Sequence, residues 1–246
     1  MSKTAMENLH ARIVDRGALL SIQEEASRRA RKRGMEALPD GILDYDLYEQ
    51  SPVRIMWILK QDREDCQDGY SYAERVRLAA KEGRIQSSPT WAPISYASYA
   101  LLNGVCDYNL IPDANSCATA MLSTAIVEIQ KELGYPRTEN QVVREGYKMY
   151  GDLLKRQIIA AAPDVVIVCL PEALKDIAMA IQQDALLCNK ADWVWGYCAA
   201  SACNSLLYLW AWHPSQTKIT QEEYVMSIVK QYEAYKCTKF KDCVNS

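Results

Sequence analysis

The chain has 246 residues, of which 49% are hydrophobic and 24% are charged, and its formal net charge is −3. This length suits one sizeable α/β domain and is short for two, and the composition excludes a disordered or fibrous protein. The small negative charge excludes a general attraction to nucleic acid or to anionic membranes, although a locally basic face is compatible with it.

The nine cysteines are expected to be reduced thiols. The first twenty residues carry several charges and lack the apolar segment of a signal peptide, so we expect neither export nor disulfides. With two histidines and cysteine spacings that match no common metal motif, we expect no metal site and no cofactor. No apolar run reaches membrane-spanning length, and we therefore expect a cytoplasmic protein that binds no membrane.

The first 45 residues are expected to form a helical extension. Residues 4–35 have the mixed polarity of a long helix that ends near Gly34. Within it, residues 28–33 ("RRARKR") are the densest basic cluster of the sequence. This cluster is compatible with a solvated helix face or with a surface that contacts phosphates.

Two strands are expected within the first 130 residues. Residues 53–59 are continuously apolar, which is typical of a parallel strand covered on both faces. A charged helix near residues 72–82 and a Tyr- and Ala-rich helix at residues 94–106 follow. Residues 125–129 then fit a short strand, although their periodicity also permits a helix.

The second half repeats the alternation of helix and strand. Thr138-x-x-Gln141 and Thr220-x-x-Glu223 are capping boxes that open helices. Residues 165–169 form the clearest buried strand, residues 192–197 fit a short one, and residues 206–212 form the last. Strands that alternate with helices indicate βαβ units and a parallel sheet in a single domain, residues 1–246.

Polar residues follow the first and the last strand directly. The first tip is Lys-Gln-Asp (residues 60–62), and the second tip is His-Pro-Ser (residues 213–215). Ligands of open parallel sheets bind outside the carboxyl ends of the strands, so we expect both tips at one edge. If one strand lies between them, strand spacing places them roughly 10 Å apart, and a nucleoside fits that gap.

Both tips resemble motifs of the uracil-DNA glycosylase superfamily. "ILKQDRED" looks like its strand-end motif Ile-Leu-Gly-Gln-Asp-Pro-Tyr-His, and "HPS" after an apolar strand is similar to its second motif. "LLKRQIIAAAPDVVIVCLPEALKDI" is similar to the elements that precede that second motif. The pattern "AIVEIQKE … LLKRQI … PDVVIVC" looks closer still to a little-characterised bacterial branch. The resemblance spans about residues 50–235 as an order of elements.

This resemblance implies a three-layer α/β fold in which helices flank a central four-stranded parallel sheet of order 2-1-3-4. In chain order, the four strands are residues 53–59, 125–129, 165–169 and 206–212. The third strand then lies between the two tips, which agrees with the expected spacing. The first 45 residues are the N-terminal extension of this domain.

The implied activity is hydrolysis of the N-glycosidic bond to a uracil-like or damaged base in DNA, as in DNA repair. Asp62, when ionised, would stabilise the sugar cation and orient the attacking water. His213 would donate a hydrogen bond to the base oxygen on which negative charge collects. These two residues are the candidate catalytic groups.

Other residues are expected to hold the substrate. Gln61 and Glu128 are candidates for contacting the base. An extruded base also needs an aromatic platform, for which the candidates are Trp91, Tyr70 and Tyr96. Ser215, the backbone N–H groups beside it and Lys60 are expected to contact a phosphate.

The chain departs from the family pattern in ways that leave alternatives open. Residues 63–65 are Arg-Glu-Asp where the family has Pro-Tyr-His, so the tyrosine that blocks thymine is missing. Lys60 replaces a glycine. Glu128 stands where the family has a base-reading asparagine. Its carboxylate accepts hydrogen bonds only, which suits an N–H-rich base edge. The alternative is that Glu128 is an ion-paired residue without a role in reading the base.

Two other functions therefore remain compatible with the sequence. One is a catalytically degenerate module that binds nucleic acid or a protein. The other is a hydrolase or transferase that acts on free nucleosides. The expected partner is accordingly DNA, including single-stranded DNA, or a nucleoside.

Overall fold

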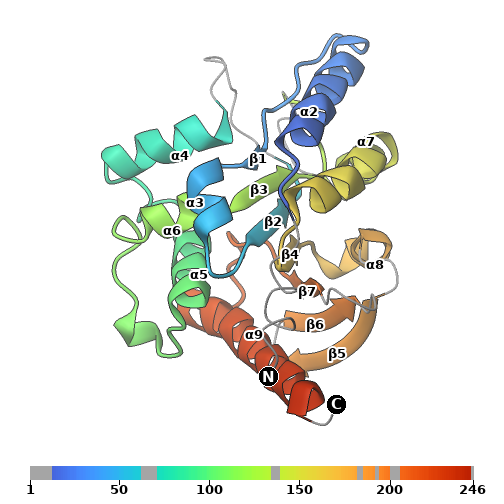
Figure 1. Cartoon of the computed structure of the whole chain (residues 1–246). Helices are drawn as coiled ribbons and strands as arrows, with labels where there is room; N and C mark the ends of the chain where they lie inside the picture. Colours follow the sequence, from blue (N-terminus) through green and yellow to red (C-terminus); the bar gives the residue numbers. More distant parts are fainter. Residues whose placement is uncertain are drawn as a thin grey trace.

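The computed structural model describes residues 13–61, 71–133, 139–181, 185–191, 194–199 and 206–244. Within these residues, seven strands form one mixed sheet of order β1-β3-β2-β4-β7-β6-β5 (Figure 1). The strands are β1 (Gly41–Ile42), β2 (Ile55–Leu59), β3 (Ala125–Glu128), β4 (Val165–Cys169), β5 (Ala185–Ala191), β6 (Val194–Ala199) and β7 (Leu206–Ala211). The α/β class expected from the sequence is confirmed.

The sheet is wider than the wholly parallel four-stranded sheet that we expected. β2 pairs in parallel with β3 on one side and with β4 on the other, and β4 pairs in parallel with β7. Antiparallel strands extend this group at both ends: β1 lies beside β3, and β6 and then β5 lie beyond β7. No pattern indicated β5, because a strand near a sheet edge does not need the continuous apolar run of a central parallel strand.

Helices precede or follow most strands, as expected. They are α2 (Arg16–Arg31), α3 (Tyr45–Gln50), α4 (Tyr72–Lys81), α5 (Trp91–Asn103), α6 (Ala118–Leu122), α7 (Asn140–Ala161), α8 (Lys175–Ile181) and α9 (Gln221–Val244), with short 3-10 helices at Tyr108–Leu110 and Glu172–Leu174. Among the described helices, none is both long and apolar enough to cross a bilayer.

Helix starts follow local capping chemistry. The first described helix, α2, begins at Arg16, where the Asp15 side chain accepts the Ala18 N–H over 2.8 Å. Residues 4–12 of the helix expected from the sequence lie outside the described residues. The expected capping box at Thr220 and Glu223 is confirmed by reciprocal hydrogen bonds between the two residues. By contrast, α7 begins after Glu139 without a side-chain cap, and Thr138 lies outside the described residues.

Side chains of the central strands alternate between two cores, one on each face of the sheet. On β2, Ile55, Trp57 and Leu59 pack in one core with α4, α5, α6 and α9. Met56 and Ile58 pack in the other core with α2, α3, α7 and α8. Helices thus cover both faces of the sheet (Figure 1). This burial on both faces explains the continuous apolar sequence of the strand.

Residues 13–45, the described part of the expected N-terminal extension, take part in this packing. The α2 side chains Leu19, Ile22 and Ala26 are buried in the second core, and α2 lies along α7 (Figure 1). β1 also adds a strand to the sheet. Residues 13–45 therefore contribute to the hydrophobic core of the domain.

Candidate functional site

The carboxyl ends of β3, β2, β4 and β7 lie together at one edge of the sheet, which we call the carboxyl edge. Glu128 ends β3 opposite Leu59 of β2, and Cys169 ends β4 opposite Ala211 of β7. The first tip follows β2 and the second tip follows β7. Because β4 alone lies between those strands, the strand spacing separates their carboxyl ends by roughly 10 Å.

Most of the predicted site residues lie at this edge: Lys60, Gln61, Glu128, His213 and Ser215. Asp62 and Tyr70 lie outside the described residues, so the pairing of Asp62 with His213 stays a prediction. In the described parts of the chain, no group of three or more His, Cys, Asp or Glu side chains is arranged to hold a metal ion.

The ring of His213 is oriented by the turn that follows it. The Ser215 backbone N–H donates to His213 Nδ1 over 3.3 Å, and Ser215 Oγ lies 2.8 Å from the same nitrogen. Since a backbone N–H can only donate, Nδ1 is an acceptor, and the neutral ring carries its proton on Nε2. Ser215, expected to contact a phosphate, thus orients the imidazole in this structure.

Gln61 is a buried carboxamide at the end of β2. Gln61 is only 6% exposed. Neither Nε2 nor Oε1 of its side chain has a hydrogen-bond partner in the described structure. A buried polar group without a partner costs about 1–3 kcal/mol. A carboxamide offers one donor and one acceptor side by side, which matches the paired donor and acceptor on the edge of a nucleobase.

Glu128 is fully buried and is held by a network of hydrogen bonds. Its Oε1 accepts the Tyr72 hydroxyl over 2.7 Å, and its backbone N–H donates to Asp40 Oδ2 over 2.7 Å. Lys131 Nζ donates to the same Asp40 oxygen over 2.8 Å and to the Glu128 carbonyl over 3.1 Å. These contacts hold Glu128 at the buried end of β3, beside the ion pair of Lys131 with Asp40, and its role as a base reader stays a prediction.

Trp91 is connected to the carboxyl edge through stacked side chains. The guanidinium carbon of Arg75 lies 5.4 Å from the centre of the Tyr72 ring and 5.9 Å from that of Trp91. Tyr72 in turn donates to Glu128. Tyr96, the other described candidate for a platform, is buried and donates its hydroxyl to Gln86.

Sequence reasoning missed Tyr72 and Arg75 as neighbours of the site. One local signal was available, because Ser71 and Glu74 form a capping box that sets the start of α4. The helix itself was expected near residues 72–82, but the contact between Tyr72 and Glu128 joins residues far apart in the chain. It depends on the placement of α4 beside β3.

Cys169 is a buried thiol at the end of β4. Burial raises the pKa of this thiol to about 12, and the charges of Glu128 and Lys60 also act on it. The Tyr224 hydroxyl lies 3.8 Å from Sγ and donates to the Trp212 carbonyl over 2.9 Å. The thiol is therefore protonated at neutral pH, which excludes Cys169 as a nucleophile.

The raised pKa of Cys169 predicts a loss of stability at alkaline pH. The unfolded thiol loses its proton near pH 9 and the folded one near pH 12, so this stabilisation is complete below pH 9 and is lost as the pH rises toward 12. Urea denaturation at pH 8 and at pH 10.5 measures how far the free energy of unfolding falls as the pH is raised. We expect this fall to be about 2 kcal/mol smaller in Cys169→Ala than in the unsubstituted protein. Cys106→Ala, at an exposed thiol, is the control. An equal loss in Cys169→Ala and in the unsubstituted protein would contradict the prediction.

No protein-family model and no curated protein matches this chain. The likeness to uracil-DNA glycosylases therefore rests on the two tips and on the order of the elements around them.

Proposed function

We propose that this protein is a uracil-DNA-glycosylase-like enzyme that hydrolyses an N-glycosidic bond at its carboxyl edge. Its core would be the three-layer unit of that superfamily, with the strands in the order β3-β2-β4-β7. The observation that carries the proposal is the position of the two tips, which follow β2 and β7 with only β4 between them. A gap of that width accommodates one nucleoside.

The proposed reaction divides the work between the two tips. Water attacks C1′ of the sugar as the bond to the base breaks, and the electron pair of that bond leaves with the base. Asp62 stabilises the positive charge on the sugar and orients the water. His213 donates its Nε2–H to the base oxygen that becomes negative, and the contacts of Ser215 with Nδ1 support this tautomer.

Gln61 is the proposed base-contacting residue. Its buried carboxamide has no hydrogen-bond partner among the described residues, and a ligand with an acceptor beside a donor would satisfy both of its polar atoms. In the uracil-DNA glycosylase motif an asparagine after the second strand reads the base, whereas this chain has the buried Glu128 there. We infer that the reading of the base has moved from β3 to the neighbouring end of β2.

One observation favours the alternative of a binding module without turnover. Glu128, at the position of the base-reading asparagine, is engaged by Tyr72 and by the network around Asp40. Such a module would bind oligonucleotides without releasing a base. Its affinity would fall as salt rises and when the basic residues of α2 are neutralised. Of these, Arg29 already pairs with Asp152 over 2.7 Å.

The experiment is an assay of base release from single-stranded oligonucleotides that carry uracil, hypoxanthine or another damaged base. We expect strand scission after alkaline treatment for at least one of these substrates, and we expect Asp62→Asn to abolish it. Asp46→Asn makes the same change at an exposed ion pair with Arg16 and should cleave normally. Activity that survives Asp62→Asn would refute the mechanism, and release from free nucleosides alone would favour the nucleoside hydrolase.

A further inference from the structure

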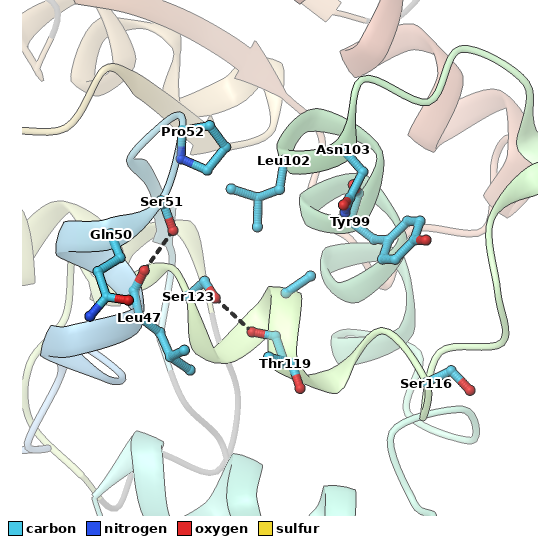
Figure 2. Close-up of a pocket in the computed structure, with 11 residues that line it drawn as sticks. Leu47, Gln50, Ser51, Pro52, Tyr99, Leu102, Asn103, Ser116, Thr119 and Ser123 are labelled. Carbon is cyan, nitrogen blue, oxygen red and sulfur yellow. Dashed lines mark hydrogen bonds between the residues drawn. The ribbon is translucent and has the colours of Figure 1, made fainter.

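A cleft of about 440 Å³ opens at the edge of the sheet opposite the carboxyl edge (Figure 2). Its walls come from the end of α3, the end of α5, and α6 with the residue that follows it. Ser51 and Pro52 in its wall precede β2, and Ser123 precedes β3, so the cleft lies at the amino ends of these strands. Its volume is within the range of small-molecule sites.

Three helices end at this cleft. α3 ends with Ser51 as its C-cap, α6 ends with Ser123 as its C-cap, and Asn103 is the last residue of α5. The last carbonyl groups of a helix lack partners within the helix and carry partial negative charge. The C-termini of three helices, with their partial negative charge, therefore adjoin the cleft.

The hydroxyl groups of Ser51 and Ser123 in the cleft already donate hydrogen bonds within the protein. Ser51 Oγ donates to the Leu47 carbonyl over 2.7 Å, and Ser123 Oγ donates to the Thr119 carbonyl over 2.8 Å (Figure 2). Each hydroxyl hydrogen is thus committed to its own helix, and each oxygen retains only lone pairs for a ligand.

Asn103 follows the same pattern. Its Nδ2 donates one of its two hydrogens to the Tyr99 carbonyl over 2.9 Å, and Oδ1 is an acceptor. Gln50 and Thr119 at the mouth are exposed and can rotate to accept or to donate. The hydroxyl oxygens of Ser51 and Ser123 are therefore fixed acceptors, and Asn103 adds a third acceptor with Oδ1.

None of the described residues that line the cleft is Asp, Glu, Lys, Arg or His. The partial negative charges that line the cleft are therefore those of the helix C-termini and of the hydroxyl oxygens of Ser51 and Ser123. Pro52 and Leu102 add apolar surface, and Tyr99 offers an aromatic ring beside Asn103 (Figure 2). A cation can pack against such a ring while its N–H groups reach the acceptors.

We propose that this cleft binds a small organic cation, with an ammonium or guanidinium group on a compact apolar body. The positive group donates to the acceptors around Ser51, Ser123 and Asn103, and the apolar body lies on Pro52 and Leu102. This site lies at the opposite edge from the proposed active site, and the inference does not depend on glycosidic activity.

The test uses three probes with one aromatic body: phenethylamine, phenethyl alcohol and phenylacetate. Calorimetric titration of the full chain should give saturable binding of the amine, with the alcohol and the acid at least about tenfold weaker, since one charge-assisted hydrogen bond supplies such a factor. Equal binding of all three probes, or no saturation with amine at about 10 mM, would overturn the proposal.

Variants at the exposed Asn103 assign the binding to this cleft. Asn103→Lys adds a competing ammonium and should weaken amine binding at least about tenfold, whereas Asn103→Asp adds a carboxylate and should strengthen it. Asn140→Lys, at the exposed start of α7, carries the same charge change away from the cleft and should bind like the unsubstituted protein. If both Asn103 variants bind the amine with unchanged affinity, the site is elsewhere and the proposal fails.

Discussion

Replacement of His213 by alanine is expected to lower the rate of base release by about 10²–10⁴-fold, the usual contribution of a positioned proton donor. The contacts of Nδ1 with Ser215 place the proton of the neutral ring on Nε2, which is the donor to the departing base in the proposed mechanism. Alanine removes that donor without adding a new group. The measurement is the single-turnover rate on whichever oligonucleotide the unsubstituted protein cleaves, so that product release does not mask the chemical step.

Ser215→Ala separates orientation of the ring from donation of the hydrogen bond. It removes the Oγ contact with Nδ1 and leaves the imidazole, so we expect an intermediate loss of about tenfold, with a shifted pH–rate profile. His10→Ala replaces the other histidine of the chain and is the matched control. A rate for His213→Ala within about twofold of that of the unsubstituted protein would be too small a loss for a catalytic proton donor. The second tip would then have no catalytic role.

Replacement of Lys131 by methionine is expected to destabilise the fold by about 3–5 kcal/mol. Lys131 Nζ lies 2.8 Å from Asp40 Oδ2, and both side chains have no exposed surface. Methionine fills a similar volume but leaves the Asp40 carboxylate buried without its counter-charge. Guanidinium denaturation monitored by circular dichroism measures the free energy of unfolding.

The double variant Asp40→Asn/Lys131→Met tests this explanation. It removes both charges, so we expect it to be less destabilised than the sum of the two single variants. Arg16→Met is the control, since the pair of Arg16 with Glu49 is exposed and should contribute at most about 1 kcal/mol. If Lys131→Met lowered the free energy of unfolding by less than about 1 kcal/mol, the buried ion pair would not be a major stabilising contact of the fold.

The Asp40 network also connects stability to the site. Asp40 accepts the backbone N–H of Glu128 with Oδ2 and the Gln157 amide of α7 with Oδ1. It thus joins the end of β3 to a helix on the second core. Loss of this carboxylate would loosen the carboxyl edge as well as lower the free energy of unfolding.

Several features followed from the sequence because they depend on neighbours in the chain. A strand covered on both faces must be apolar throughout, so residues 53–59 and 165–169 identified β2 and β4. The helix start at Thr220 followed from a reciprocal hydrogen bond that spans three residues. The two polar tips were also visible, because each directly follows an apolar run.

The tertiary structure decided what depends on contacts between distant segments. The hairpin of β5 and β6 exists because β6 pairs with β7, and no local pattern specifies that partner. The sequence is equally compatible with an exposed and with a buried Glu128, and only the tertiary structure shows that it is buried and accepts the Tyr72 hydroxyl. Hydrogen bonds and burial between remote residues are set by packing of the whole chain, whereas apolar runs and helix caps are set by residues a few positions apart.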